Sequence, residues 1–185
     1  INSYKFHFKS NILIIRGNNI YGKRQFPEKL IPSCIYNLHH LENIDMTCNQ
    51  ISVISKSFSS LLNVKIINLD YNNISIMYLK KLPPTVTKLS ISHNNIINIL
   101  YASSQFQLNS IKWLNLKHNN IRRFPLIILK MYNLEYLELS MNQIETIPHK
   151  INHLIKLKEL QLDNNNLVSV SKGILQLDSL ETLSV

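Results

Sequence analysis

Glycine is scarce in this chain, which has only three among its 185 residues. Tight turns most often use glycine because it adopts positive φ at no steric cost. The chain must therefore close its turns with another residue. Asparagine is the abundant alternative: stretches such as LDYNNI, ISHNNI and IKWLNLKHNNI place it just before an apolar residue, where a strand would disfavour it.

Cysteine is also scarce, with only Cys34 and Cys48 in the whole chain. This pair does not resemble the disulfide-stapled ends of many secreted solenoids. Asn73-Ile74-Ser75 is the only glycosylation sequon in a chain crowded with asparagine. Both features favour a reducing compartment, so we expect a cytoplasmic protein, with an extracellular one as the alternative.

Long apolar runs are missing as well. The longest stretch without Asp, Glu, Lys or Arg runs from Leu89 to Ile111, and Ser, His, Asn and Gln interrupt it. It is therefore no transmembrane helix, and we expect no membrane insertion. No targeting signal opens the chain. It begins at Ile1 and stops at Val185 in the middle of a pattern, so we expect a fragment.

One frame recurs along the chain. An apolar residue is followed by apolar residues at positions +3 and +5, asparagine at +8 and an apolar residue at +10. The frame starts at residues 10, 41, 64, 86, 111, 134, 157 and 180, and the first and last copies are imperfect or incomplete. Units this short cannot bury an apolar face alone, so neighbouring units must stack on a shared core.

This frame resembles the leucine-rich-repeat family, whose pattern is LxxLxLxxNxL. Arms such as Phe124-Pro125 and Ile147-Pro148, each followed by Ile three residues later, resemble the Ras-group and Scribble-type intracellular repeats. The resemblance covers residues 10–185 and implies an α/β solenoid. Its horseshoe would carry a concave parallel sheet of about eight strands and irregular, 3-10 or short helical convex segments.

The asparagine at +8 is predicted to be structural. Inside the turn, backbone groups need partners away from water, and an asparagine amide supplies both donors and an acceptor. A stacked column would satisfy these groups from unit to unit. This predicted asparagine ladder consists of Asn18, Asn49, Asn72, Asn94, Asn119, Asn142 and Asn165.

Two segments depart from the frame. Residues 1–9 alternate aromatic and polar side chains at Tyr4, Phe6 and Phe8, which indicates a capping strand; a decayed earlier repeat is the alternative. Residues 21–30 form an insertion carrying Lys23, Arg24 and Lys29. Insertions in solenoids form surface loops, so this segment is either a contact element or a tolerated loop.

The outward positions of the predicted strands define a candidate binding surface. Since strand side chains alternate, positions +2 and +4 point away from the core, joined by +6 and +7. Trp, Tyr, His and Met gather at its centre, which is the composition of a protein-binding hot spot. The predicted partner-binding residues are Ile66, Tyr71, Lys88, His93, Trp113, Lys117, His118, Tyr136, Glu138 and Met141.

The charge distribution argues against nucleic acid as the partner of this surface. The chain has a formal charge of +9, yet five of its eleven acidic residues and only three of its twenty basic residues fall on the predicted concave face. Phosphate recognition requires clustered Lys and Arg there. The basic excess lies elsewhere, where it either touches acidic lipid or RNA or only keeps the chain soluble.

No catalytic, cofactor or metal motif stands out. His93 and His118 occupy the same position in adjacent repeats, but no third ligand accompanies them, whereas zinc takes three or four. Nucleophile elbows, P-loops and Rossmann glycines do not occur. We therefore expect a non-catalytic protein-interaction module, a scaffold or regulator in signalling, with no cofactor. The alternatives are an ectodomain fragment of a Toll-like receptor and the regulatory repeat domain of a larger enzyme.

Overall fold

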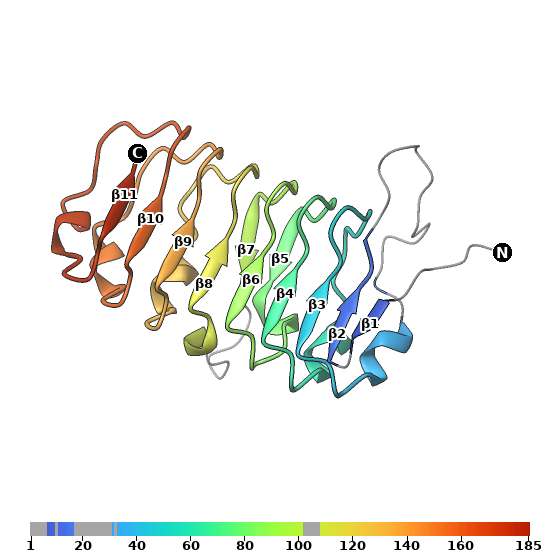
Figure 1. Ribbon diagram of the computed structural model, residues 1–185. Coiled ribbons are helices and arrows are strands. Elements are labelled where there is room, and N and C mark those ends of the chain that lie inside the picture. The colour runs from blue at the N-terminus through green and yellow to red at the C-terminus, as the bar shows by residue number, and fades with distance from the viewer. Residues whose placement is uncertain (1–6, 10, 17–30, 32, 102–107) are drawn as a thin grey trace.

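The computed structural model describes residues 7–9, 11–16, 31, 33–101 and 108–185. Short strands, one from each repeat, lie side by side in chain order (Figure 1). They form a sheet of nine strands, ordered β1 (His7–Lys9), β2 (Ile12–Ile14), β3 (Asn43–Asp45), β4 (Ile66–Asn68), β6 (Lys88–Ser90), β8 (Trp113–Asn115), β9 (Tyr136–Glu138), β10 (Glu159–Gln161) and β11 (Thr182–Ser184).

The eight strands from β2 to β11 in this sheet run parallel and in constant register. Each occupies positions +2 to +4 of its repeat, so its middle residue is the apolar one at +3. Leu89 pairs with Leu114, and Leu114 with Leu137, and all three are buried. Equivalent residues therefore stand in columns across the sheet, with neighbours about 4.8 Å apart.

Strand β1 differs from the repeats in direction, because it pairs antiparallel with β2. A further repeat would have added another parallel strand, whereas a capping segment has no such constraint. The predicted boundaries of the cap and of the repeat domain stay predictions. The predicted insertion at residues 21–30 and the first ladder residue, Asn18, lie outside the described residues.

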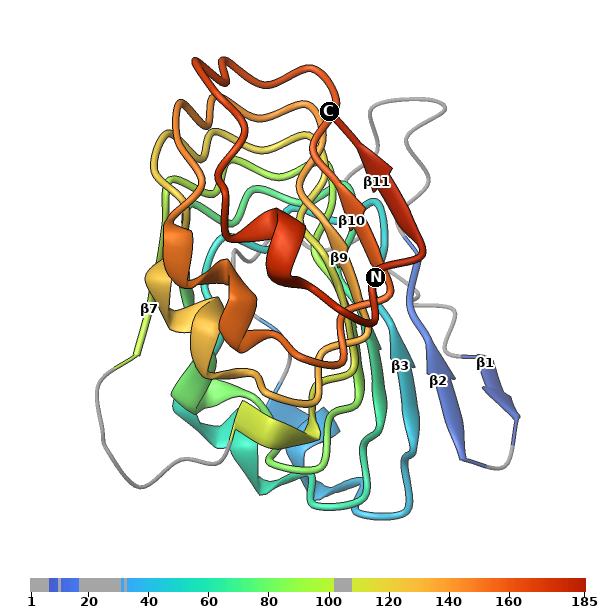
Figure 2. The same cartoon turned by 90° about the vertical axis from the view of Figure 1, so that its left-hand side faces the viewer.

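Short 3-10 helices cover the side opposite the sheet (Figure 2). Pro125 and Pro148 each precede such a helix and accept its first hydrogen bond, from the N–H groups of Ile128 and Ile151 at 2.9 and 3.0 Å. Proline suits this position because its φ is already helical. The helices are η2 (Ser33–Asn37), η3 (Lys56–Ser60), η4 (Leu79–Lys81), η5 (Leu108–Ser110), η6 (Leu126–Lys130), η7 (His149–His153) and η8 (Ile174–Gln176).

A second, two-stranded sheet departs from the expected irregular or helical segments. Strands β5 (Ile76–Tyr78) and β7 (Asn98–Leu100) pair in parallel away from the main sheet. Both contain isoleucine next to large apolar residues, which suit extended backbone. Two adjacent repeats with such segments can pair directly, so an extra ladder precedes the 3-10 helices η4 and η5 there.

The core fills the space between the main sheet and the helices. It consists of the apolar frame residues together with one or two apolar residues from most helices, such as Phe58, Ile128 and Ile151, all fully buried. No single repeat encloses this core, so each contributes a slab that its neighbours cover. The predicted solenoid, with a parallel sheet of eight strands and 3-10 segments opposite it, is confirmed.

Candidate functional site

Asparagine side chains hold the turn that follows each strand. The Asn119 amide nitrogen donates to the carbonyls of Ile91, Leu116 and Lys117 at 3.0 to 3.2 Å. Its oxygen accepts a 2.9 Å bond from the N–H of Ile96. Asn72, Asn94 and Asn142 repeat this arrangement, while Asn49 and Asn165 show most of it. Each amide thus serves two neighbouring repeats at once.

The residue just before each of the six described ladder asparagines adopts positive φ. Six non-glycine residues at +7 have φ between 51° and 56°, namely Cys48, Tyr71, His93, His118, Met141 and Asn164. Left-handed backbone costs an L-residue about 1–2 kcal/mol. A hydrogen bond from the +7 N–H to the next repeat offsets this cost, as from His118 to the Ser140 carbonyl at 2.9 Å. These residues close the turns that glycine would ordinarily close.

The predicted partner-binding residues lie on one surface, which we call the sheet face. It is formed by the side chains at +2, +4, +6 and +7 in each repeat. Five of the ten predicted residues lie in strands: Ile66 in β4, Lys88 in β6, Trp113 in β8, and Tyr136 and Glu138 in β9. The other five lie in the turns directly after the strands: Tyr71, His93, Lys117, His118 and Met141.

A first row of stacked groups crosses the strands at +2. The rings of Trp113 and Tyr136 stack with centroids 4.8 Å apart and planes inclined by 6°. The Lys88 ammonium lies 4.2 Å from the centroid of the Trp113 ring. Such cation–π and stacking contacts are favourable. Because Lys88 and Tyr136 cover its two faces, Trp113 offers its edge to a partner.

A second row crosses the turns at +7. The Tyr71 and His93 rings stack with centroids 4.2 Å apart and planes 8° apart. His93 and His118 stack at 4.4 Å and 22°. Burial, and next the neighbouring His118, lower the pKa of His93, although Asp70 works in the opposite direction. His93, at the centre of the second row, therefore stays neutral to lower pH than an isolated histidine would.

Small polar residues lie between the two rows at +4 and +6. Asp70 accepts hydrogen bonds from the Ser90 hydroxyl at 2.7 Å and from the Ser92 N–H at 2.6 Å. Both serines are buried. The surface between the two rows therefore consists of short side chains that hydrogen-bond to one another, and the rings of the two rows project beyond them.

Glu138 lies deeper than a contact residue would, since it is only 8% exposed. It accepts a 2.8 Å bond from the Ser140 N–H and a 3.5 Å bond from the Tyr136 hydroxyl. Burial, followed by the charges of Glu138 and Glu159, raises the pKa of Tyr136 to about 12. Glu138 thus lies beneath Tyr136 and accepts from its hydroxyl, a supporting position that the sequence did not indicate.

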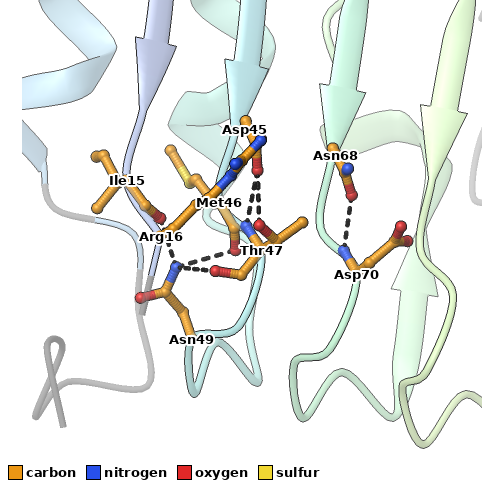
Figure 3. A network of polar contacts seen from close by, with 8 residues as sticks. All are labelled: Ile15, Arg16, Asp45, Met46, Thr47, Asn49, Asn68 and Asp70. Atoms are coloured by element: carbon orange, nitrogen blue, oxygen red, sulfur yellow. Dashed lines mark hydrogen bonds and ion pairs between the residues drawn. The ribbon is translucent and has the colours of Figure 1, made fainter. Parts of the chain in front are cut away.

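The sheet face is hollowed beside the first row. A cavity of about 360 Å³ lies between strands β2 and β8, and Ile66, Asp70, Lys88 and Trp113 are among its lining residues. Asp45, which forms an ion pair with Arg16 (Figure 3), also lines this cavity. Burial pushes the pKa of Asp45 upward, but hydrogen bonds from Arg16 and Thr47 outweigh it, so the pKa is lowered.

The described part of the chain also bears on metal binding and on membrane spanning. No three His, Cys, Asp or Glu side chains converge there as a metal site would require. No helix among the described residues is long and apolar enough to cross a bilayer. The sheet face presents ring edges, an ammonium, carboxylates and amides.

The sequence is similar to repeat-containing proteins. The family described as Leucine Rich Repeat matches residues 133–154. An uncharacterized protein of Schizosaccharomyces pombe is 44% identical over 43 residues, which cover 23% of this chain and 12% of that protein. A probable serine/threonine-protein kinase, pats1, of Dictyostelium discoideum is 28% identical over 108 residues, covering 55% of this chain and 3% of the kinase.

Solved structures share the fold. A leucine-rich-repeat protein of Leptospira interrogans has a TM-score of 0.74 and 29% identity, covering 84% of this chain and 39% of that one. The plant peptide hormone receptor RGFR1, solved in complex with RGF2, has a TM-score of 0.65 and 23% identity, covering 83% and 29%. The latter likeness concerns the fold alone.

The chain spans well under half the length of each of these proteins. Their fold is a common protein–protein interaction module, and such modules are typically non-catalytic. The frame, the parallel sheet and these likenesses agree. This chain has the leucine-rich-repeat fold and carries the repeat of that family at residues 133–154.

Proposed function

We propose that this domain binds a partner protein through the sheet face, as a scaffold or regulator in signalling. The observation that carries the proposal is the pair of stacked rows at the centre of that face. Trp113 and Tyr136 anchor one row, and Tyr71, His93 and His118 form the other. Trp and Tyr are the residues most enriched among binding hot spots.

Stacking prepares these side chains for binding. A ring already fixed between neighbours loses little rotamer freedom when a partner docks, and an interface otherwise loses about 0.5–1.5 kcal/mol for each immobilised side chain. Ile66 and Met141, which are 38% and 42% exposed, add apolar surface beside the rows. The partner would thus meet a rigid surface of ring edges flanked by apolar side chains.

Charged residues would set the orientation of the partner. Asp70, Lys88 and Lys117 lie on the sheet face among the rings, and buried Glu138 acts through Tyr136. Three bases against five acids on this face supply too little positive charge for phosphate recognition. We infer a protein partner here and no nucleic acid.

A pull-down with a matched control tests the proposal. Trp113→Ala combined with Tyr136→Ala removes the first row, whereas Leu126→Ala combined with Tyr132→Ala removes two exposed side chains from the opposite side. The partner retained by wild type should be lost with the first variant and kept with the second. Circular dichroism verifies that both variants fold. Equal retention by both folded variants would overturn the assignment to the sheet face.

A second candidate is a regulatory repeat domain within a larger signalling enzyme. The likeness to the probable kinase of Dictyostelium discoideum supports it, since that match extends over 108 residues. The plant hormone receptor supports only the fold of a receptor ectodomain. Cys34 and Cys48 are both free thiols, which favours a cytoplasmic location. A hydrophobic leader in the full reading frame would favour the ectodomain instead.

A further inference from the structure

The side of the solenoid opposite the sheet carries a large excess of positive charge. We call it the helix side and define it as residues 52–62, 75–84, 97–101, 108–109, 122–132, 145–155 and 168–178. Only two acidic residues lie on it, Glu145 and Asp178. Its eight basic residues are Lys56, Lys80, Lys81, Arg122, Arg123, Lys130, Lys150 and Lys172.

These basic residues are available to a partner. All except Lys81 are exposed. The ion pairs within the described residues join Arg16 to Asp45, Lys65 to Glu42, and Glu135 to two lysines. None of them involves a base of the helix side, so its positive charge is not neutralised within the described part of the fold.

Large apolar side chains share this side with the basic residues. Of the sixteen exposed large hydrophobic residues in the described chain, eleven lie here, and ten of those eleven are aliphatic. Leu126 is 66% exposed and Leu175 is 83% exposed. The eleven are Val53, Leu62, Ile76, Ile97, Leu100, Leu126, Tyr132, Ile155, Val168, Val170 and Leu175.

Basic and apolar residues occur together in successive repeats. Lys130 accompanies Leu126 in η6, Lys172 shortly precedes Leu175, and Lys150 shortly precedes Ile155. An open cavity of about 450 Å³ adds Arg122 and Arg123 beside Ile97. Bases that only kept the chain soluble would not need exposed aliphatic neighbours, whereas a surface that docks on something both anionic and apolar would.

We propose that the helix side docks on an anionic membrane surface. Lys and Arg are attracted by acidic headgroups, and exposed Leu, Ile and Val reach the boundary with the acyl chains. Arg122 and Arg123, at the open cavity, would bind headgroup phosphate, because guanidinium groups match phosphate oxygens. Single-stranded nucleic acid would instead select aromatic side chains for base stacking, and among the described residues of this side Tyr132 is the one exposed Phe, Tyr or Trp.

Vesicle binding with two charge-matched variants tests the proposal. The helix-side variant changes Lys80, Lys130 and Lys150 to Gln. The control variant changes Lys65, Lys112 and Lys158 to Gln; these lysines are ion-paired at the start of the strands, and the net charge falls equally in both proteins. Sedimentation is measured with phosphatidylcholine vesicles, with and without phosphatidylserine.

Wild type should bind only the vesicles that contain phosphatidylserine, and added salt should weaken binding. Each lysine near an anionic surface contributes about fivefold, so the helix-side variant should lose roughly a hundredfold while the control stays close to wild type. Leu126→Ser with Leu175→Ser should weaken binding at high salt, where the apolar contribution remains.

Three results would each overturn the proposal: equal loss in both lysine variants, no binding by wild type, or tighter binding to a single-stranded RNA oligonucleotide than to vesicles. None of these outcomes depends on the sheet face, so this proposal and the proposed protein-binding function fail separately.

Discussion

The sheet face and the helix side use the same repeats in opposite ways. On the sheet face, side chains contact one another: rings stack, Lys88 covers Trp113, and Asp70 binds two serines. On the helix side, seven of the eight bases are exposed and none forms an ion pair within the described chain. The sheet-face rings fix one another, whereas most bases of the helix side extend into solvent, with Arg122 donating to Gln143 and Lys130 lying near the Tyr101 ring.

The backbone explains this difference. Sheet pairing holds equivalent residues in constant register, so side chains in one column meet at about 4.8 Å. Helix-side segments are less regular: the step between full repeats varies from 22 to 25 residues, and two adjacent repeats have strands β5 and β7 before their 3-10 helices η4 and η5. Columns of contacting side chains form where the register is constant, which explains why the two stacked rows lie on the sheet face.

The largest loss of stability is expected at a ladder asparagine, because its hydrogen bonds hold the turn that joins the sheet face to the helix side. Asn119→Ala removes bonds to three carbonyls and one N–H, in a side chain that is 5% exposed. Leaving buried polar groups unpaired should lower the free energy of unfolding by about 3 kcal/mol. Asn120→Ala, at the exposed next position, should change it by less than about 0.5 kcal/mol. Urea denaturation measures both, and equal losses would contradict the structural role of the ladder.

The next largest loss of stability should distinguish a ring on the sheet face from an exposed side chain on the helix side. Trp113→Ala removes a half-buried ring that stacks on Tyr136 and lies beneath the Lys88 ammonium, so the free energy of unfolding should fall by about 1.5 kcal/mol. Leu126→Ala on the helix side should lower it by less than about 0.5 kcal/mol, because Leu126 is 66% exposed. If Leu126→Ala proved as costly in the same urea titration, the helix side would be as well packed as the sheet face.

Removing one base from each surface should give a smaller contrast. Arg16→Gln breaks the pair with Asp45, but Arg16 is largely exposed, so the loss should stay below about 1 kcal/mol. Lys80→Gln should cause no loss. The lowered pKa of Asp45 contributes stability above its unfolded pKa that disappears as pH falls through the folded value. Arg16→Gln should therefore flatten the acid limb of stability plotted against pH, and an unchanged limb would show that the pair has no effect.

The smallest expected effect is a change of pKa within the second row. His118→Gln removes the charge that, after burial, lowers the pKa of His93, so the pKa of His93 should rise. A lowered histidine pKa means that the unfolded chain binds the extra proton first, so stability is lost as pH falls from about 6.5 through the folded value. That loss should shrink in His118→Gln. Imidazole proton shifts in an NMR titration give the pKa of His93 in wild type and in His118→Gln. An unchanged pKa of His93 would mean that His118 does not contribute to lowering it.

Sequence reasoning predicted the repeat register because a buried apolar residue at +3 leaves few alternatives. Ile44, Leu89 and Leu114 each lie at the centre of a strand. Asn119 and its equivalents were identifiable for a similar reason, since one side chain meets the bonding needs of every turn.

The sequence pattern did not predict how deeply each outward side chain is buried or which rings stack on each other. Glu138 is buried and Glu159 is exposed, although both occupy outward positions of neighbouring strands. Glu138 occupies position +4 and Glu159 position +2, and the pattern assigned both positions to the surface without separating their depths. The stack of Tyr71 on His93 likewise depends on ring orientation. The β5–β7 pair formed because two neighbouring repeats have extended segments at the same level, which neither segment indicates alone.

The left-handed backbone at +7 restricts what this surface can become. Cys, Tyr, His, Met and Asn occupy the six positions with positive φ, and no β-branched residue does. Val, Ile and Thr are strongly disfavoured in that region. A library that randomised the sheet face would therefore yield folded proteins mainly when its +7 codons omitted those three residues, whereas +2 accepts β-branched side chains such as Ile66 freely. The geometry of the turn thus limits which new binding specificities the second row can evolve.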